Sequence, residues 1–348
     1  MASRTMLAAR RHGNRRVTVE QRPVPRPGPG EVLVAIRAAG ICGSDLHGFR
    51  LPQPGPAVLD YVPGHEPCGV VAEVGPEVSG WAEGDRVVVY HRYTCRRCRY
   101  CLAGQRNLCP YRDPGGRRAY GANPDGADAE YMVSHAADLM PLAPDFDFLD
   151  GAVLACQAGT AYYGLRHIRL DGTDRLLVTG LGPVGLLAFM FARAMGAETI
   201  GVDPSPERRE LARRLGLQRV LDPAEAPLEE QTKAAWPDGA TAWAETSGAG
   251  AVHATIPAVA AINARVAIIG LGRSAPALSL PSLMGKQITV VASNLWPYSA
   301  WEEIGDVVRR KAVPIRQVVT HELPIEEAPQ GFALADAAAA GKVVFRFE

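Results

Sequence analysis

The chain contains 348 residues, of which 37 are basic and 37 acidic, so its formal net charge at pH 7 is zero. This length exceeds what one hydrophobic core usually supports, and we therefore expect two domains. The balanced charge disfavours nucleic acid and anionic membranes as partners, and no apolar run reaches the roughly 20 residues that span a bilayer.

The first residues lack the long apolar segment of a secretory signal, which predicts a cytoplasmic protein. A reducing cytoplasm keeps thiols free, so the seven cysteines are expected to bind metal rather than form disulfides. From about residue 17 to residue 150, short β-forming runs such as 32–37, 69–74 and 86–90 are separated by Gly and Pro. This pattern predicts a compact antiparallel β domain.

Two segments of this domain carry residues that suit a catalytic zinc ion. Cys42 begins the run Cys-Gly-Ser-Asp-Leu-His, and His65 lies in Gly-His-Glu. A catalytic zinc site needs about three protein ligands and one open position, and Cys156, where the chain passes between the domains, is the natural third ligand. The alternative is that Cys42 and Cys156 are buried apolar thiols and His65 is a satisfied turn histidine.

A second cluster has the spacing Cys-x2-Cys-x2-Cys-x7-Cys, and its members are Cys95, Cys98, Cys101 and Cys109. Four thiolates at short spacings can surround one zinc ion tetrahedrally and leave no open position, which is typical of a structural site. An iron–sulfur cluster is the rival on spacing alone, and disulfides are disfavoured by the compartment.

Two further features belong to this part of the chain. The arginines among these cysteines could offset thiolate charge, whereas a nucleic-acid-binding finger would require a net basic domain, contrary to the balanced charge. Cys68, the remaining cysteine, lies beside a β run and is expected to be a small buried apolar residue rather than a ligand.

From about residue 156 the pattern changes to longer helices that alternate with apolar strands. The predicted strands are 176–178, 199–202, 220–221, 241–244, 266–269 and 288–292. This alternation predicts a doubly wound parallel sheet, and hence an α/β protein. The tail from about Trp296 returns to mixed short elements and is expected to rejoin the first domain.

The first of these strands leads into a glycine-rich turn and a helix. The turn contains Gly180, Gly182, Pro183, Val184 and Gly185. Gly180 permits the tight turn, Gly182 lets the backbone approach a pyrophosphate, and Gly185 lets the helix pack close to the strand. Because a second strand and a terminal acid follow at the expected spacing, the segment predicts dinucleotide binding rather than a purely structural turn.

The terminal acid, Asp203, lies 23 positions after Gly180. A carboxylate at this point can accept hydrogen bonds from an adenosine ribose but would repel the 2′-phosphate of NADP, so NAD is the favoured cofactor. Arg208, five residues later, either approaches the ribose or is a solvated charge at the start of the next helix.

Several motifs together identify a family. They are Gly64-His65-Glu66-x2-Gly69-x5-Gly75-x2-Val78, the four-cysteine cluster, Gly84-Asp85-Arg86-Val87, the glycine-rich turn and the closing Gly341-Lys342-Val343-Val344. With them, the chain resembles the zinc-dependent alcohol dehydrogenases of the medium-chain dehydrogenase/reductase superfamily. The resemblance implies a GroES-like catalytic domain over 1–155, completed by 296–348, a Rossmann domain over 156–295, and an active site in the cleft between them.

The resemblance also implies roles for individual residues. It assigns the catalytic zinc to Cys42, His65 and Cys156, with Glu66 as a nearby acid that can approach the metal. Asp45 matches the acid that orients the histidine ligand.

A proton relay and a cofactor contact follow in the same way. Ser44 and His47 match the hydroxyl and the imidazole of the relay, and the imidazole suits this role because its unperturbed pKa is about 6.5. Thr160 matches a residue packed beside the nicotinamide.

The motifs combine features of two subtypes of this enzyme family. Cys-Gly-Ser-Asp-x-His is the form common in polyol and threonine dehydrogenases of this superfamily, whereas Cys156 as third ligand resembles the alcohol dehydrogenase arrangement. His91 and Arg92 occupy positions where relatives place residues of the pocket wall, and polar groups there favour a hydroxylated substrate. The other possibility is that both side chains point to solvent.

These inferences predict an NAD-dependent enzyme that contains two zinc ions and acts on the hydroxyl of a polyol, cyclitol or sugar derivative. The main alternative is an aliphatic or aromatic alcohol dehydrogenase or carbonyl reductase. The sequence does not fix whether the physiological reaction is alcohol oxidation or carbonyl reduction. Rivals from other classes are a non-catalytic zinc protein and a nucleic-acid-binding module.

The last predicted strand, 288–292, is apolar and is expected at the edge of the sheet, where an unpaired edge invites association. The resemblance implies a homodimer in which two such edges pair, or a homotetramer built from two dimers. The alternative is that the tail over 296–301 covers this edge.

Overall fold

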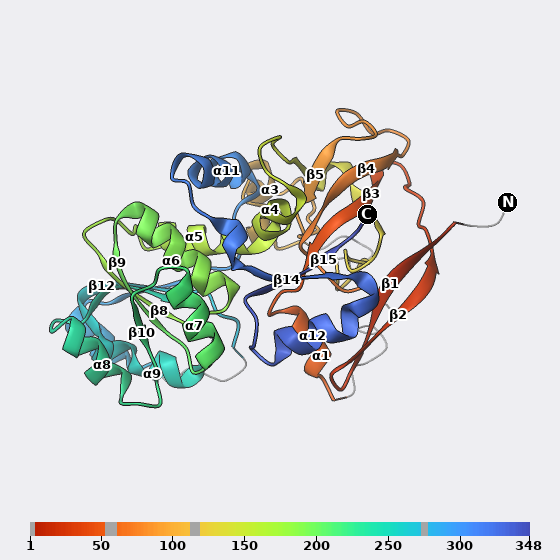
Figure 1. Ribbon diagram of the computed structural model, residues 1–348. Coiled ribbons are helices and arrows are strands. Elements are labelled where there is room, and N and C mark those ends of the chain that lie inside the picture. The colour runs from red at the N-terminus through yellow and green to blue at the C-terminus, as the bar shows by residue number, and fades with distance from the viewer. Residues whose placement is uncertain (1–3, 53–60, 112–118, 273–277) are drawn as a thin grey trace.

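The structure is a computed structural model that describes residues 4–52, 61–111, 119–272 and 278–348 (Figure 1). Two large sheets, one of seven strands and one of six, lie in opposite halves of the molecule, and a two-stranded ribbon flanks the first (Figure 1). The ribbon pairs β1 (Thr5–Gly13) with β2 (Arg16–Pro23). Within the described residues, no helix is both long enough and apolar enough to cross a membrane.

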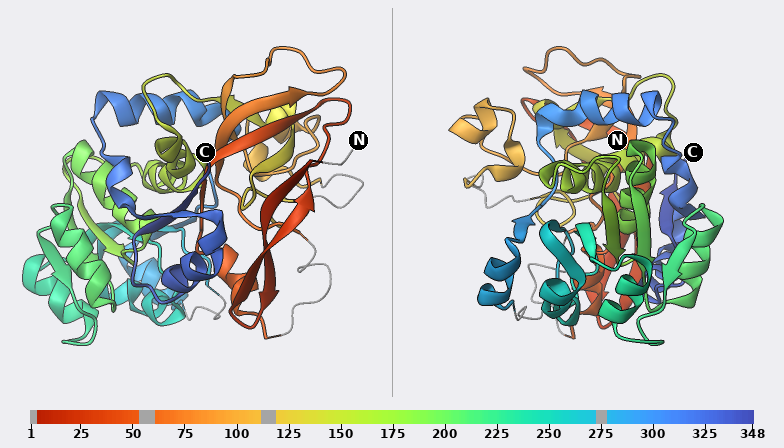
Figure 2. Two further views of the ribbon diagram at one scale, coloured as in Figure 1. Left: turned by 45° about the vertical axis from the view of Figure 1, so that its right-hand side comes forward. Right: turned by 90° about the vertical axis from the view of Figure 1, so that its left-hand side faces the viewer.

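The seven-stranded sheet has the order β14-β15-β3-β4-β5-β7, and β6 pairs with β3. Its strands are β3 (Glu31–Gly40), β4 (Pro67–Val74), β5 (Arg86–Val89), β6 (Tyr131–His135), β7 (Leu139–Pro141), β14 (Val319–Pro324) and β15 (Lys342–Arg346). β15 pairs antiparallel with β3, so the two ends of the chain share one sheet. Figure 2 shows the blue C-terminal segment beside the red N-terminal strands.

The six-stranded sheet is entirely parallel and has the order β10-β9-β8-β11-β12-β13. Its strands are β8 (Arg175–Thr179), β9 (Glu198–Val202), β10 (Arg219–Leu221), β11 (Ala240–Glu245), β12 (Ala260–Ile268) and β13 (Thr289–Ala292). This is the strand order 3-2-1-4-5-6 of a dinucleotide-binding sheet, which confirms the predicted doubly wound fold. β13 lies at the edge, as predicted.

Helices of the parallel half connect these strands and cover the sheet (Figure 1). They are α5 (Gly159–His167), α6 (Pro183–Met195), α7 (Pro206–Arg214), α8 (Leu228–Ala235), α9 (Gly250–Val259) and α10 (Leu280–Lys286). The other half and its tail carry α1 (Asp45–Arg50), α3 (Arg99–Leu102), α4 (Phe148–Val153), α11 (Trp301–Arg310) and α12 (Ala328–Asp336).

One hydrophobic core runs through the junction between the two halves. It includes Ala38 on the first sheet, Tyr90 directly after β5, Ala155 between α4 and α5, and Leu176 in β8 of the parallel sheet. Because this cluster is continuous, the segment from α4 to α5 is held from both sides. The same segment carries Cys156.

The tail packs against the first sheet rather than over β13. The Trp296 ring lies 5.2 Å from that of Tyr90, and Trp301 donates a hydrogen bond to the carbonyl of Pro141. This segment of the tail therefore does not cover the edge of the parallel sheet.

Candidate active site and metal centres

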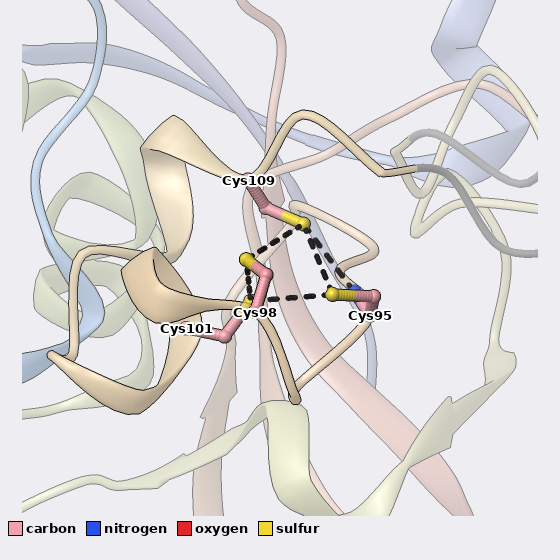
Figure 3. A group of neighbouring side chains, drawn as sticks. All are labelled: Cys95, Cys98, Cys101 and Cys109. Carbon is pink, nitrogen blue, oxygen red and sulfur yellow. Dashed lines mark hydrogen bonds between the residues drawn. The ribbon is translucent and has the colours of Figure 1, made fainter.

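The four-cysteine cluster forms a small lobe between β5 and β6. The sulfur atoms of Cys95 and Cys109 lie 3.6 Å apart, those of Cys98 and Cys101 3.6 Å, those of Cys98 and Cys109 3.9 Å, and those of Cys95 and Cys101 4.0 Å. Figure 3 shows the four side chains converging on a common point. All of these thiols are free of disulfides.

These separations fit a single tetrahedral zinc ion. A Zn–S bond of about 2.3 Å places the ligand sulfurs about 3.8 Å apart at the tetrahedral angle. A four-iron cluster binds one thiolate at each of four separate irons, which would hold the sulfurs farther apart. Although burial opposes it, backbone hydrogen bonds from Arg97 and Cys98 lower the pKa of Cys95 to about 6, so one ligand is readily ionised.

Two arginines of the lobe fasten it to the rest of the protein. Arg96 and Arg106 lie 2.6 and 3.4 Å from the carboxylate of Asp138, which is fully buried and also accepts a hydrogen bond from Tyr120. The Arg106 guanidinium stacks 3.8 Å from the ring centre of Tyr298. These two side chains therefore face the protein, which argues against their use on nucleic acid.

The second cluster draws its residues from three separate segments. Cys42 follows β3, His65 and Glu66 precede β4, and Cys156 lies between α4 and α5. The potential ligand atoms of all four residues lie within 4.8 Å of one another. The structure thus brings together the residues that the sequence singled out, although they span 115 positions of the chain.

A local irregularity places Cys156. Residues Leu154–Ala158 form a π-helical turn between α4 and α5. Such a turn inserts one residue into a helix and redirects the side chains around it, and it is common at functional sites. Thr160, one turn later, donates a hydrogen bond of 2.7 Å to the carbonyl of Cys156 and is partly buried.

One carboxylate orients two of the candidate ligands. Asp45 accepts a hydrogen bond of 3.0 Å from Nδ1 of His65 through one oxygen and a bond of 2.9 Å from the backbone N–H of Cys42 through the other. The Nε2 atom of His65 is thereby directed to the cluster, where it lies 3.4 Å from the Ser44 hydroxyl. A carboxylate that fixes a ligating histidine in this way is common in zinc sites. His47 lies on α1, partly buried.

The electrostatics of this cluster suit a divalent cation. A hydrogen bond from Cys156 holds the pKa of Cys42 well below its ordinary value, against the effect of burial and with support from His65. The same hydrogen bond and burial raise the pKa of Cys156. Cys42 is therefore the more readily ionised of the two thiols, and a bound cation would favour the thiolate form of both.

The acid beside the cluster has a partner that sequence reasoning missed. Glu66 and Lys342 are both fully buried and form an ion pair, and Lys342 also donates a hydrogen bond of 2.7 Å to the carbonyl of Ile41. Burial raises the pKa of Glu66 to about 8, although Lys342 opposes this rise. One feature of the sequence could have predicted this ion pair. Lys342 is the single charged residue at the start of the apolar β run Gly-Lys-Val-Val-Phe, and a lysine that is buried in such a run needs a buried acid as its partner.

The ring of His91 borders the same site. It lies 4.9 Å from the ring of His65 in an edge-to-face arrangement, and the residue is only 8% exposed. Burial, followed by His65 and Arg92, lowers the pKa of His91 well below its ordinary value. The possibility that His91 points to solvent is therefore wrong, whereas Arg92 is partly exposed.

The glycine-rich turn has the predicted geometry. Gly180 adopts φ +87°, which favours glycine, and a Cβ on Gly185 would lie 1.8 Å from the carbonyl oxygen of Gly180. Gly182 caps α6 and Pro183 is its first residue, with Val184 next and partly buried. Since no side chain caps this helix, its first N–H groups remain available to an anion.

Asp203 directly follows β9 and is nearly fully buried beside this turn. Its carboxylate accepts hydrogen bonds of 2.7 Å from the N–H of Leu181 and 2.8 Å from that of Ser205. Arg208 lies 3.9 Å from the same carboxylate and close to Gly182. Arg208 is thus directed to the glycine turn rather than into solvent.

The fold and these two centres define a zinc-binding dehydrogenase. The chain matches the alcohol dehydrogenase GroES-like domain family over residues 28–145 and the zinc-binding dehydrogenase family over residues 183–310. It belongs to the zinc-dependent alcohol dehydrogenase family of the medium-chain dehydrogenase/reductase superfamily.

Individual relatives match over nearly the whole chain. An uncharacterized zinc-type alcohol dehydrogenase-like protein of Escherichia coli (strain K12) is 34% identical over 99% of each chain. An L-threonine 3-dehydrogenase of Xanthomonas oryzae pv. oryzae is 31% identical over 96% of this chain and 97% of its own. Among solved structures, an alcohol dehydrogenase from Thermus sp. ATN1 aligns with a TM-score of 0.89 at 29% identity, over 99% of this chain and 100% of its own.

Proposed function

We propose that this protein is an NAD-dependent dehydrogenase that acts on a primary or secondary hydroxyl of a polar small molecule, such as a polyol, cyclitol or sugar derivative. The observation that carries the proposal is the convergence of Cys42, His65 and Cys156, with ligand atoms within 4.8 Å of one another. Three ligands of mixed type leave a position open for substrate, unlike the closed four-thiol lobe.

When bound, zinc would polarise the substrate oxygen and NAD would accept a hydride. Asp45 fixes the imidazole of His65 and the loop that carries Cys42. The hydroxyl of Ser44, 3.4 Å from Nε2 of His65, lies where it can accept the proton that leaves the substrate. We assign His47, one turn along α1, to the next position of this proton path.

The polar character of the substrate rests on two observations. His91, which is nearly fully buried, borders the cluster, and its imidazole is polar where an alkyl substrate would favour an apolar wall. Curated relatives at 31% identity are named for threonine, a polar β-hydroxy amino acid. The direct test is a panel of polyols, sugars, amino alcohols and simple alcohols assayed for reduction of NAD. Reduction by simple alkyl alcohols alone would contradict the proposed substrate class.

The choice of NAD rests on Asp203. Its carboxylate already accepts two backbone N–H groups beside the glycine turn, and a 2′-phosphate would meet this negative charge. Arg208, 3.9 Å away, offers a positive charge that offsets part of the repulsion. We expect the Asp203→Ser variant to use NAD less well and NADP better than the unmodified enzyme. Equal use of both cofactors by the unmodified enzyme would contradict this assignment.

We also propose that the enzyme is a homodimer or a dimer of dimers. β13 is an edge strand with partly buried Val290 and Val291, and the adjacent helix α10 exposes Leu280 and Met284 at 67% and 76%. An unpaired edge with apolar neighbours favours pairing with a second copy across a two-fold axis. Light scattering should give at least the mass of a dimer, and Val290→Pro, which removes a ladder donor, should shift it toward monomer.

A further inference from the structure

The strand β11 ends in a fully buried acid, Glu245, at the carboxyl edge of the parallel sheet. β11 lies between β12 and β8, the strand that leads into the glycine-rich turn. The strand order reverses between β8 and β11, and a dinucleotide binds across the edge of a sheet at such a point. Asp203 follows β9, on the other side of β8, and marks the adenosine half. The loop after β11 is therefore on the side of the nicotinamide half.

This loop, residues 246–248, packs against the segments that follow both neighbouring strands. The Thr246 hydroxyl donates a hydrogen bond of 2.7 Å to the carbonyl of Gly180 in the glycine-rich turn. On the other side, a Cβ on Gly270 would lie 2.2 Å from the backbone nitrogen of Gly248, so this close approach requires a glycine after β12. The position of the loop therefore bears on the shape of the whole edge that faces the cofactor.

The carboxylate of Glu245 holds the loop with one oxygen and a histidine with the other. Its Oε1 atom accepts hydrogen bonds of 2.8 and 3.0 Å from the N–H groups of Ser247 and Gly248, and another from the Ser247 hydroxyl. Its Oε2 atom accepts a bond of 2.9 Å from Nε2 of His253 on α9 and a longer one of 3.2 Å from Gly248. A carboxylate can only accept, so Nε2 of His253 is the donor.

His253 is a polar residue on the buried face of its helix. The residue is 6% exposed, and the other residues that α9 buries are Ile256 and Val259. Its Nδ1 atom has no hydrogen-bond partner among the residues that the structure describes. An imidazole with one unpaired nitrogen is unfavourable in a core, where an apolar side chain would leave no polar atom unpaired. The bond to Glu245 is therefore the role that we assign to this histidine.

We propose that His253 is a positioning residue for the cofactor, because it fixes the Glu245 carboxylate so that loop 246–248 is held ready for the nicotinamide half of the dinucleotide. Without the imidazole, the long bond from Gly248 would remain at Oε2, and the carboxylate could rotate away from the loop. The loop would then adopt its binding form for part of the time, which raises the apparent Kd by the inverse of that fraction. This inference rests on the proposed dehydrogenase function.

The test compares the binding of the whole cofactor with that of its adenosine half. In calorimetric titrations, His253→Leu should raise the Kd of NADH at least about tenfold, since a hydrogen bond to a charged group is worth about that factor. The Kd of AMP, which lacks the nicotinamide half, should stay within about twofold. His253→Gln keeps a donor nitrogen and should recover part of the NADH affinity. If His253→Leu does not fold, His253→Phe, which is closer in size to histidine, is measured in its place.

Kinetics should show the same separation. Because saturating cofactor restores the binding form of the loop, the KM for NAD in His253→Leu should rise at least about tenfold, while kcat falls less than about threefold. The zinc content should stay that of the unmodified enzyme. A general loss of structure would instead lower kcat and zinc content together.

Thr241→Val is the matched control, because it removes a hydrogen bond to another buried carboxylate at the opposite end of the same strand. The Thr241 hydroxyl donates a bond of 2.8 Å to Asp174, which is 4% exposed. This variant should lose stability, as His253→Leu does, but it should bind NADH as the unmodified enzyme does. Equal loss of NADH affinity in both variants would assign the effect to stability.

The remaining outcomes separate this inference from the proposed function. An unchanged Kd of NADH in His253→Leu, or an equal loss of affinity for NADH and AMP, would overturn the positioning role and leave the dehydrogenase function intact. Oxidation of no alcohol by an unmodified protein that binds NADH would overturn the proposed function and leave the role of His253 in cofactor binding. Failure of the unmodified protein to bind NADH would overturn both.

Discussion

The two candidate metal centres of this protein both use cysteine ligands, but they are built in opposite ways. The lobe takes its four cysteines from residues 95–109, a single short stretch, and three of them are only partly buried. The candidate catalytic cluster takes its ligands from positions 42, 65 and 156, which the fold of the whole first sheet and the junction must bring together. A centre made of local residues can stabilise its own segment, whereas a centre made of distant residues depends on the fold around it.

Their supporting residues differ in the same way. The lobe is attached through Arg96 and Arg106 to the buried carboxylate of Asp138. The candidate catalytic cluster is supported by Asp45 and by the ion pair of Glu66 with Lys342, which comes from the far end of the chain. We therefore expect loss of the first centre to reduce stability and loss of the second to reduce activity.

The largest effect is expected from Cys98→Ser. Because the lobe has little apolar core of its own, removing one of four ligands should lower the free energy of unfolding by more than about 4 kcal/mol. Thermal or denaturant unfolding of the purified variant measures this change. Unaltered stability would contradict a structural role for the lobe.

Cys156→Ser should show the opposite behaviour. Loss of a candidate catalytic ligand should reduce kcat/KM by more than about a hundredfold, since even residues that only orient zinc ligands contribute 10- to 100-fold. The circular dichroism spectrum should stay that of the unmodified protein. Cys68→Ser is the matched control, because Cys68 is fully buried but not part of either cluster, so it should cost stability and leave activity in the folded fraction.

Asp45→Asn tests the orientation of the ligands. An asparagine can accept one hydrogen bond through its carbonyl, but its amide nitrogen cannot accept the second, so either His65 or the N–H of Cys42 loses its partner. Zinc affinity, measured by competition with a chelator, should fall about 10- to 100-fold. An unchanged affinity would show that Asp45 does not position the cluster.

The smallest effect concerns the docking of α12, the helix near the C-terminal end of the chain. Asp336 on α12 forms ion pairs with Arg15 and Arg50, and these partners lower its pKa although burial opposes them. A carboxyl whose folded pKa is lowered stabilises the fold above its unfolded pKa, about 3.9, and loses this contribution as pH falls through the folded value.

Asp336→Asn should therefore cost at most about 1 kcal/mol at pH 7, because the arginines are solvent-exposed. The cost should disappear in unfolding measurements well below pH 3.8. A difference that persists in acid would assign the effect to packing rather than to charge.

Local patterns were enough to predict part of this structure. The cysteine spacing predicted that the four thiols of the lobe would cluster, and the glycine turn followed by Asp203 predicted the strand, helix and acid of a dinucleotide fold. In each case the residues that interact are close in sequence or follow a fixed topology. The parallel strands and the edge position of β13 followed from the same alternation of strands and helices.

The remaining features depend on contacts between distant segments, which the residues alone did not specify. The pairing of Lys342 with Glu66 joins β15 to the loop before β4, and the docking of Arg96 and Arg106 on Asp138 joins the lobe to the segment before β7. The π-helical turn at Cys156 also left no signal in the sequence, because Leu-Ala-Cys-Gln-Ala is equally compatible with an ordinary helix.

Metal content tests the central claim most directly. Zinc measured by mass spectrometry on purified protein should be two ions per chain in the unmodified enzyme and one in Cys156→Ser, with the lobe still loaded. Cys98→Ser should lose the zinc ion of the lobe and keep the ion at the candidate catalytic site. A chelator that enters the substrate site should then remove this remaining ion, and activity should be lost with it. One zinc per chain in the unmodified protein, or loss of both ions from Cys156→Ser, would contradict two independent centres with separate roles.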